Sequence, residues 1–578
     1  MISGRTAVRR AVIGLLAGSA GGVVLALTLG NGFWGIPLAA LVGVGYATTF
    51  RPARHTYVDS SMTAAALSVL LWAVVSVITL PLLAGQPPQW TAAGMRTLFP
   101  ALVGWIVTGL LVGALVPGLS DLAIRLFGPE PEPVAAPRVV SPRVVSTRVV
   151  ILGGGFAGAT TAARLERAFG ADPSVSLTLI SDTNALLFTP MLAEVAASSL
   201  EASHISSPLR TGLHRTEVVR RSVASIDLED RCVRLTPDSY APEPPDVPFD
   251  HLVLAVGAVS HYVGLANVEA ESFDFKTLTD AMRLRSHAID MFERADREPD
   301  PATRQAMLTF VVAGGGFAGA ELAGGLNDFT RGMLAYYPNI PPGDVQIILV
   351  HSRDRILPEL SDSLAAYALE RMAARGVTFK LNARVADARR GAVLLNPAEE
   401  IRTETLVWTA GTKPHPLVAT LAVERDRRGA VVVAPTLAVP GHPGLWAVGD
   451  CASVPDGDAG RSCPPTAQFA IRQAATLARN IHAAVSGAPL KPFHFEALGT
   501  LCVVGHHTAC AEIKGLRFSG LFAWLLWRVI YLGKLPGLER KAHVLGDWVI
   551  ELFFPRDIAQ TIDLGPHPRT EEAPCRRS

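Results

Sequence analysis

The residues best suited to chemistry lie in one string of seven, Gly-Gly-Gly-Phe-Ala-Gly-Ala, which fills 153–159 and returns at 314–320. Each copy follows an apolar run and leads into an Ala-rich stretch of helical pattern. In that strand–turn–helix setting, a Gly-x-Gly-x-x-Gly string holds the pyrophosphate of a dinucleotide on the helix N-terminus. Two copies predict two nucleotide domains, one nested in the other, and hence a flavin together with a nicotinamide cofactor.

The three glycines of each string have different roles. The first permits a tight turn, the second lets the pyrophosphate approach the backbone, and the third lets the helix pack closely on the strand. The predicted cofactor-binding residues of the two strings are Gly153, Gly155, Phe156, Ala157 and Gly158, and then Gly314, Gly316, Phe317, Ala318 and Gly319.

The elements around these strings divide into an apolar front part and a part in which strands and helices alternate. Four apolar stretches, at about 11–30, 33–50, 62–84 and 97–118, each approach the ~20 residues that cross a bilayer core. We expect a four-helix transmembrane region over 1–127. Its uncharged interiors favour an anchor, or a vestibule for a lipid-soluble substrate, over a pump. A cleaved signal peptide is the other interpretation of the first stretch.

The orientation of this region follows from its basic residues. Arginines precede the first stretch and lie between the second and third, whereas the connection between the first and second is uncharged. The positive-inside rule therefore puts both ends of the bundle in the cytoplasm. A Pro-rich linker that serves as a spacer is expected over 128–147.

Composition narrows the function classes. The net charge of the 578 residues is +1, which indicates neither a nucleic acid nor an acidic substrate as a partner. The mean hydropathy of +0.31 is high for a soluble chain. Six cysteines without a Cys-x-x-Cys pair indicate reduced thiols and count against dithiol chemistry.

The part from 148 to about 557 resembles the type II NADH dehydrogenase family, which are single-chain, non-pumping flavoproteins that reduce membrane quinones. The first 147 residues lie outside this resemblance. Beyond the glycine strings it rests on the stretches Phe188 to Leu192, Phe249 to Gly257, Trp408 to Gly411, Leu445 to Asp450, Ala467 to Ala470 and Ser519 to Trp527.

The resemblance implies an α/β fold with two nested Rossmann-type domains, one for FAD and one for NAD(P). These follow the all-α transmembrane region and precede a C-terminal membrane-contact segment. The implied reaction moves hydride from NADH or NADPH to FAD and then two electrons to a membrane quinone, without proton pumping. The implied location is the cell (inner, cytoplasmic) membrane, with a multi-pass chain in the lipid bilayer and the catalytic part facing the cytoplasm.

The resemblance also implies domain bounds. The FAD domain is expected to be discontinuous, over 148–305 and 405–500, with the NAD(P) domain between its parts at 306–404. The membrane-association region is expected over 501–578.

Individual roles follow from the matched positions. Asp450 resembles an acid that hydrogen-bonds the ribityl chain of the flavin, although a helix-capping acid is an alternative. Glu321 resembles a catalytic carboxylate near the nicotinamide–flavin contact, or it stabilises a helix dipole. Gln468 resembles a catalytic residue that hydrogen-bonds a quinone carbonyl. The further implied residues are Pro190, Gly257, Gly411, Gly449 and Ala467 for the cofactors, and Ala470 and Gln473 for the quinone.

The chain departs from the family pattern at several places. Arg472 and Ala474 replace a Gln and a Gly of the quinone motif. Ser181 stands where an acid normally binds the flavin ribose, and Asp182 beside it is expected to substitute.

A further departure concerns the nicotinamide domain. His351 stands where an acid normally binds the ribose diol and repels a 2′-phosphate. With Arg353 nearby, the donor is expected to be NADH or NADPH. The alternative interpretation is that Arg353 is solvated, or that it pairs with Asp354 or Glu359.

The C-terminal stretch, from about 516 to 554, alternates Trp, Leu and Phe with Arg528, Lys534, Arg540 and Lys541. This pattern predicts membrane contact with the basic residues toward headgroups, and a homodimer seam is the other interpretation. The His506, His507 and Cys510 spacing matches no standard zinc pattern, so no metal site is expected.

Two other functions stay open on the sequence. One is a related flavoenzyme with another acceptor, such as a sulfide:quinone reductase, which needs a redox cysteine pair. Cys451 and Cys463 are the candidates for such a pair. The other is a flavin-based membrane redox sensor. Polar residues inside the apolar stretches would favour this function.

Overall fold

The structure is a computed structural model that describes residues 4–28, 34–49, 57–88, 97–127, 146–239, 241–456 and 462–562. The chain divides into two units, Met1–Val139 and Val140–Ser578. All of the expected linker before Ser146 lies outside the described residues.

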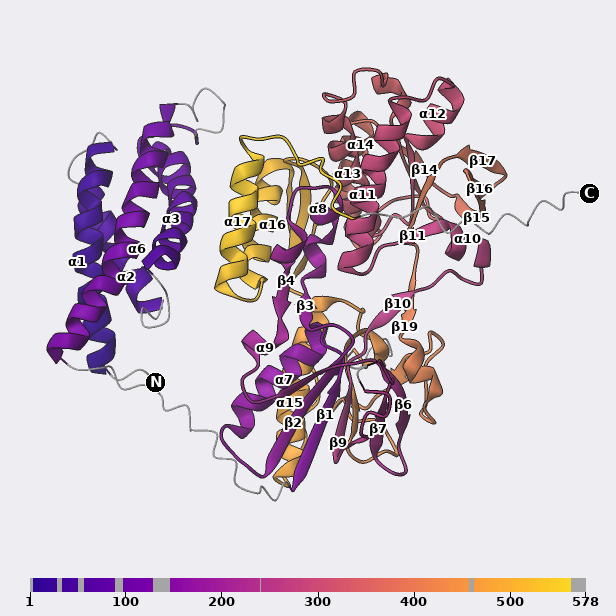
Figure 1. The fold of residues 1–578 in the computed structure, drawn as a ribbon, viewed down its shortest axis with the longest axis horizontal. Coiled ribbons are helices and arrows are strands. Elements are labelled where there is room, and N and C mark those ends of the chain that lie inside the picture. Colours follow the sequence, from indigo (N-terminus) through magenta and orange to yellow (C-terminus); the bar gives the residue numbers. More distant parts are fainter. Residues whose placement is uncertain are drawn as a thin grey trace, which may run out of the picture. The chain divides into compact units, whose positions relative to one another are not determined.

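The first unit is helical, as expected (Figure 1). Three of its helical segments, Val8–Leu27, Ser60–Leu83 and Phe99–Ala123, are long and apolar enough to cross a membrane. Among the described residues, the other helix covers 15 residues and rises about 22 Å over them, which is less than the ~30 Å bilayer core. The helices are α1 (Gly4–Thr28), α2 (Gly35–Thr49), α3 (Tyr57–Trp72), which continues through a π-helical segment (Ala73–Thr79) into α4 (Leu80–Leu83), and α6 (Phe99–Phe127).

Small residues let these helices pack backbone to backbone. A Cβ atom added at Gly43 of α2 would overlap the carbonyl oxygen of Gly14 in α1, and one at Gly113 of α6 would overlap that of Ser60 in α3. Such contacts are typical of transmembrane helix pairs, where van der Waals packing drives association. Buried hydroxyls of the described residues have partners on the same helix or on a neighbouring one. That of Tyr46 in α2, for example, donates to the carbonyl of Ser60 in α3.

We expect the substitution Gly43→Val to destabilise the α1–α2 pair by about 1–3 kcal/mol or more, because the side chain would force the two backbones apart. Gly45→Val on the same helix is the matched control, since a Cβ there meets nothing within 4 Å. Thermal unfolding of the detergent-solubilised protein, followed by circular dichroism, compares the two. Equal unfolding curves would contradict the glycine-mediated packing.

The second unit contains two five-stranded parallel sheets. In the first sheet the order is β21-β9-β1-β2-β5, and the first glycine string joins β1 to α7. In the second sheet the order is β11-β18-β12-β13-β14, and the second string joins β12 to α13. The bounds in the first are β1 (Thr147–Leu152), α7 (Phe156–Phe169), β2 (Val175–Ser181), β5 (Glu217–Arg220), β9 (His251–Leu254) and β21 (Leu445–Ala447). Those in the second are β11 (Ser272–Asp274), β12 (Thr309–Ala313), α13 (Phe317–Met333), β13 (Gln346–Val350), α14 (Asp362–Ala374), β14 (Val377–Lys380) and β18 (Thr405–Trp408).

The strand sequences explain why these sheets are parallel and covered on both faces. β12 is buried at every position, and β13 at every position but its first. Continuous apolar runs of this kind are typical of strands that helices cover on both sides. The glycine strings therefore lie at the carboxyl ends of central strands, where nucleotides bind in such folds.

The strand pairing does not follow the expected domain bounds at 305/306 and 404/405. β11 and β18 pair with each other, and β18 pairs with β12, so both belong to the second sheet. The second sheet therefore takes strands from 272–408. Two strands, β10 (Ala258–Ser260) and β19 (Thr412–Pro414), form an antiparallel ribbon that joins the two sheets (Figure 1).

Smaller elements complete the second unit. Antiparallel strands flank each parallel sheet, and a three-stranded antiparallel sheet with two helices closes the chain. The C-terminal elements are α15 (Ala467–Val485), β23 (Gly499–Val503), β24 (Ala509–Ile513), β25 (Leu516–Ser519), α16 (Gly520–Lys534) and α17 (Leu538–Glu551). The flanking elements include α8 (Leu192–Ala196), β6 (Val223–Asp227), β7 (Cys232–Leu235), β8 (Val247–Pro248), α10 (Ala266–Glu271), α11 (Leu278–Ala295), α12 (Pro301–Met307), β15 (Arg384–Arg389), β16 (Ala392–Asn396) and β17 (Glu399–Arg402).

Candidate active site

The two glycine turns have the same geometry. Gly153 and Gly314 adopt φ values of +104° and +118°, which L side chains rarely adopt. A Cβ at Gly158 would overlap the carbonyl oxygen of Gly153, and one at Gly319 would overlap that of Gly314. The first and third glycines of each string are therefore required by the fold, as the sequence predicts.

The second glycine of each string faces open space. A Cβ at Gly155 meets nothing within 4 Å, and one at Gly316 meets only Glu359 Oε1, at 3.9 Å. These glycines are the N-caps of α7 and α13, and no side chain caps either helix. Each turn thus leaves helix N–H groups and space for an anion, which is the requirement for a dinucleotide pyrophosphate.

In each sheet, a residue at the carboxyl end of the strand that follows the glycine-turn helix lies against the middle one of the three consecutive glycines. It is the last residue of β2 in the first sheet and the residue directly after β13 in the second. A Cβ at Gly154 would lie 2.7 Å from Ser181 Oγ, and one at Gly315 would lie 2.7 Å from His351 Cγ. Ser181 and His351 are therefore at equivalent positions. Ser181 is buried, whereas Asp182 and Arg353 are exposed.

On the flavin side, three separate segments meet at Gly449. A Cβ there would lie 3.2 Å from that of Ala157 in α7 and 3.7 Å from that of Ala470 in α15. Gln473 Oε1 accepts a hydrogen bond from the Gly449 amide at 2.9 Å. The structure thus places Gln473 and Ala470, both expected near the quinone, against the backbone of the Gly449–Asp450 turn.

Asp450, the acid of this turn, is partly buried. Burial raises the pKa of its carboxyl, and the charges of Lys276 and Arg428 act in the opposite direction. A buried acid with these neighbours accepts or donates a hydrogen bond at modest cost, which suits contact with ligand hydroxyls.

Gln468 lies in the first turn of α15, and both ends of its amide contact the following loop. Its Oε1 accepts from the Leu498 amide at 3.2 Å, and its Nε2 lies 3.5 Å from the Gly499 carbonyl. Gly257 and Gly411 lie on the connections between the sheets, where their carbonyls accept from the amides of His415 and His261.

Glu321 is the central acid of the site. Its Oε1 accepts from the Val503 amide of β23 at 3.3 Å. Burial raises the pKa of this carboxyl to about 8, and the nearby Glu194 adds to the effect. With this pKa, the Glu321 carboxyl is mostly protonated at neutral pH.

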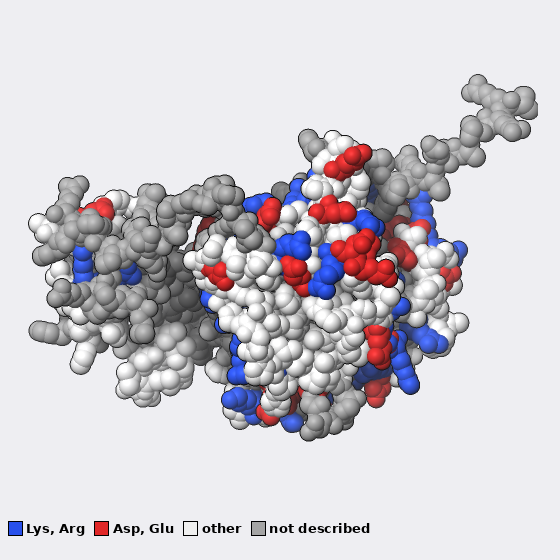
Figure 2. All heavy atoms as spheres, turned by 90° about the horizontal axis from the view of Figure 1, so that it is seen from below, with Lys and Arg blue, Asp and Glu red and all other residues white. Residues whose placement is uncertain are grey.

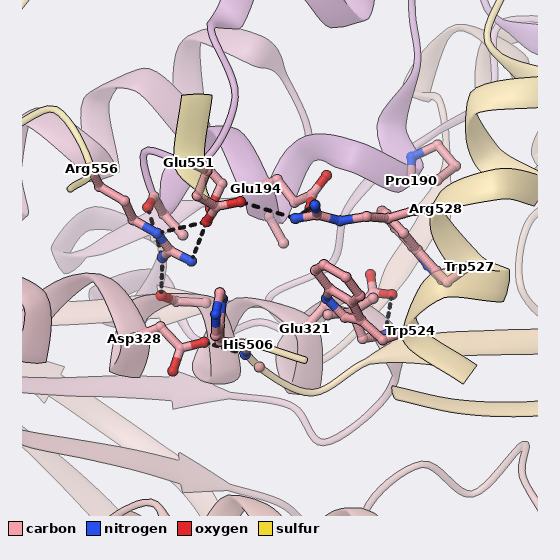
Figure 3. Close-up of a pocket in the computed structure, with 16 residues that line it drawn as sticks. Pro190, Glu194, Glu321, Asp328, His506, Trp524, Trp527, Arg528, Glu551 and Arg556 are labelled. Carbon is pink, nitrogen blue, oxygen red and sulfur yellow. Dashed lines mark hydrogen bonds and ion pairs between the residues drawn. The ribbon is translucent and has the colours of Figure 1, made fainter. Parts of the chain in front are cut away.

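Glu321 lines a narrow cavity of about 40 Å³ between α8, α13, β23 and the C-terminal helices. This volume holds about three water molecules. Figure 3 shows Glu194, Arg528 and Glu551 on one side of the cavity and Glu321, Asp328 and His506 on the other. Pro190, Trp524 and Trp527 also line it, so one end is aromatic.

Sequence analysis missed Glu194, which stands two residues beyond a matched stretch. Burial raises the pKa of its carboxyl to about 7, and Arg528 opposes the shift. Its Oε2 is buried without a hydrogen-bond partner among the described residues. A Glu within an otherwise apolar stretch, Met191 to Ala197, is the sequence signal that could have identified it.

Arg528 lies inside the protein, so the prediction that its side chain lies toward lipid headgroups is wrong. Its side chain is 12% exposed, pairs with Glu551 at 2.9 Å, and lies between the rings of Trp524 and Trp548 at 3.8 and 4.6 Å. Arg556 pairs with the other oxygen of Glu551 at 2.9 Å. The physical reason is that the buried carboxylate of Glu551 needs cationic partners.

We expect the substitution Arg528→Met to cost about 3–5 kcal/mol of folding free energy, because it leaves Glu551 and Glu194 short of a buried cation. Arg517→Ala, which removes an exposed arginine 4.0 Å from Glu512, should cost about 0–1 kcal/mol. Chemical denaturation of the two variants measures the difference. If Arg528→Met left the free energy of unfolding unchanged, the network would contribute nothing to the docking of the C-terminal helices.

The thiols and histidines of the site do not form other known centres. Cys451 and Cys463 are buried and free, burial raises the pKa of each thiol to about 11, and each donates to backbone carbonyls. This geometry does not support a redox cysteine pair. Across the described ranges, no three His, Cys, Asp or Glu side chains group closely enough to hold a metal ion.

This arrangement defines a class of protein. Residues 147–474 match the family described as pyridine nucleotide-disulphide oxidoreductase, and residues 498–557 match the NDH2 C-terminal domain. The chain belongs to the type II NADH:quinone oxidoreductase family.

Individual relatives support this assignment. The chain is 33% identical to the type II NADH:quinone oxidoreductase Ndh of Mycobacterium tuberculosis, over 74% of this chain and 91% of that relative. It is 32% identical to a probable NADH dehydrogenase of Dictyostelium discoideum, over 66% and 85%. The structure of NDH2 from Plasmodium falciparum in complex with NADH shares the fold, with a TM-score of 0.66, 18% identity, and coverage of 72% of this chain and 100% of that one.

Proposed function

We propose that this protein is a membrane-bound NAD(P)H:quinone oxidoreductase that uses FAD and moves no protons across the membrane. The observation that carries the proposal is the pair of equivalent glycine turns on two joined parallel sheets. Glu321 on α13, whose carboxyl has a raised pKa of about 8, adds a proton source. The relatives named above support the nicotinamide donor and the quinone acceptor.

The first turn suits FAD. The open N-terminus of α7 at Gly155 would hold the pyrophosphate, and exposed Asp182 would bind the ribose in place of buried Ser181. Asp450 and the start of α15 at Ala467 would bind the rest of the flavin, since Thr466 gives that helix no side-chain cap. When bound, FAD accepts hydride from NAD(P)H and returns two electrons to a quinone.

The second turn suits the nicotinamide nucleotide, with its pyrophosphate at Gly316 and its ribose near His351. The overall reaction consumes NAD(P)H, a quinone and one proton, and yields NAD(P)⁺ and a quinol. The Glu321 carboxyl would supply that proton, because it is mostly protonated at neutral pH and lines a cavity with room for water.

The quinone would approach from the C-terminal region. The exposed surface of this region supports association with the membrane. Large apolar side chains of α16, α17 and the segment that follows are exposed, namely Leu521, Phe522, Val529, Ile550, Leu552, Phe553 and Phe554. Such a surface favours contact with lipid. Gln468 would bind a quinone carbonyl by exchanging its contacts with 498–499.

The remaining parts of the proposal concern location and partners. The first unit would anchor the chain as a multi-pass segment, with the catalytic part in the cytoplasm and no part in proton transport. On the face shown in Figure 2, acidic and basic side chains of the second unit are intermixed, which gives no support to nucleic-acid binding. A homodimer through the C-terminal helices stays a further proposal.

Reconstitution into liposomes that contain a quinone tests the proposed function. NAD(P)H added outside should be oxidised without a membrane potential, as reported by a potential-sensitive dye. Absence of quinone-dependent oxidation would contradict the enzyme assignment. A potential that an uncoupler abolishes would contradict the absence of pumping.

We expect Gln468→Ala to raise the KM for a short-chain quinone about tenfold, because one hydrogen bond to the acceptor is lost. Bleaching of the flavin absorbance by NAD(P)H should stay unchanged. Gln305→Ala on exposed α12 is the matched control. A Gln468→Ala variant with unchanged KM would remove Gln468 from the quinone site.

A further inference from the structure

The end of β13 in the second sheet differs in chemistry from that of an NAD-binding domain. In NAD-binding domains an acid at this place accepts hydrogen bonds from the ribose and repels a 2′-phosphate. Here the position is His351, whose Nδ1 accepts a hydrogen bond from the Gly315 amide at 3.0 Å. The neutral ring must then carry its proton on Nε2.

The Nε2–H group of His351 has no hydrogen-bond partner among the described residues. The Nε2 atom is buried, and within the described chain it makes no hydrogen bond. Burial and the charge of Arg353 lower the pKa of the ring, so the neutral tautomer persists at neutral pH. A buried N–H donor without an acceptor costs folding free energy. This cost indicates that a ligand atom accepts the hydrogen bond.

The turn after His351 is held firmly in place. Leu357 N donates to the Gly315 carbonyl at 2.7 Å, and the carbonyls of His351 and Arg353 accept from Ala383 and Asn382 at 3.0 and 2.9 Å. The glycine turn and the segment 351–357 therefore form one rigid frame. The side chains of Ser352 and Arg353 project from this frame and are exposed.

The charged groups around the turn leave Arg353 available. Arg355 pairs with Asp362, whereas Arg353 makes no ion pair with a described carboxylate. Glu359 lies near Gly316, at the pyrophosphate end of the turn, and Asp354 is exposed beside Arg353. An arginine without a described carboxylate partner, which follows a serine and a histidine in the chain, is suited to a phosphate.

We propose that the nicotinamide site binds a 2′-phosphate, so that NADPH is its preferred donor, with Arg353, the Ser352 hydroxyl and His351 Nε2–H as the phosphate ligands. The inference rests on the proposed function for the identity of the site. It goes beyond that function because it assigns the donor and the residues that select it. The alternative that Arg353 pairs with Asp354 or Glu359 has no ion pair among the described residues to support it.

Two nucleotides that differ only in the 2′-phosphate test the inference. Adenosine 2′,5′-bisphosphate and AMP are titrated calorimetrically into the full-length, flavin-loaded protein in detergent. The bisphosphate should bind at least about tenfold more tightly. Equal affinities, or tighter binding of AMP, would overturn the proposal.

Variants identify the residues that carry the selectivity. Arg353→Ala should lower the affinity for the bisphosphate about tenfold and leave AMP unchanged, and His351→Glu should reverse the preference. Arg384→Ala, an exposed arginine of the same domain, is the control and should change neither affinity. Loss of both affinities in Arg353→Ala would contradict a specific phosphate contact.

A failure of the 2′-phosphate site can be distinguished from a failure of the proposed function. If NADH bleaches the flavin but the bisphosphate binds no better than AMP, only this inference fails. If neither NADH nor NADPH bleaches the flavin, the proposed function fails and this inference with it.

Discussion

Replacing Gly319 by valine should abolish bleaching of the bound flavin by both NADH and NADPH. A Cβ at this position would overlap the carbonyl oxygen of Gly314, so the turn and the first turn of α13 must move apart. The amides that face the second nucleotide would then lose their arrangement. Flavin content should stay near that of the unchanged protein, because the first glycine turn lies on a different sheet.

Gly158→Val is the counterpart in the first sheet, and it should yield protein without flavin. The two variants together assign one nucleotide to each turn. Gly332→Ala, also on α13, is the control for a helix glycine, since a Cβ there meets nothing within 4 Å. If Gly319→Val lost flavin and Gly158→Val kept it, the assignment of the two sheets would be reversed.

The second large effect is expected for Glu321→Gln, which removes the transferable proton and keeps the shape of the side chain. Quinone-dependent recovery of the flavin absorbance should slow about a hundredfold. Bleaching by NAD(P)H should change little, because hydride transfer takes no proton from this carboxyl. Glu370→Gln, an exposed acid on α14, is the control. Equal slowing of both half-reactions would contradict a role confined to the quinone step.

The pH dependence gives an independent test of Glu321. With a pKa of about 8, the carboxyl is protonated below pH 8 and loses its proton as the pH rises through that value. The quinone half-reaction should therefore fall above about pH 8 in the unchanged protein and lose this decline in Glu321→Gln.

The pH dependence of the free energy of unfolding should also reflect the Glu321 carboxyl. The raised pKa makes the native state hold a proton that the unfolded state has released. Stability should thus decline between the unfolded value of 4.5 and about 8, and the decline should be smaller in the Gln variant. An identical stability profile in both proteins would contradict the burial of a protonated Glu321.

The sequence predicted most of the nucleotide-binding framework. The repeated glycine string fixes two strand–turn–helix units, because only glycine fits where α7 and α13 approach Gly153 and Gly314. It also placed Ser181 and His351 at equivalent positions, which the packing against Gly154 and Gly315 confirms. These features depend on short-range spacing, which is visible along the chain.

The parts that sequence analysis missed depend on contacts between distant segments. Arg528 has the flanking residues of a membrane-surface arginine, and only the pairing with Glu551 shows that it is buried. Glu194 and Glu321 lie far apart in the chain and line one cavity. Likewise, β11 joins the second sheet through pairing with β18, which no local pattern indicates.

The central claim is that one chain passes electrons from NAD(P)H to a quinone through a bound flavin. Anaerobic stopped-flow absorbance of the detergent-purified protein tests it most directly, with NADH or NADPH mixed first and a short-chain quinone second. We predict rapid bleaching followed by quinone-driven recovery, with NADPH effective at the lower concentration. Bleaching without recovery would contradict the quinone assignment, and the absence of bleaching by either nucleotide would contradict the account as a whole.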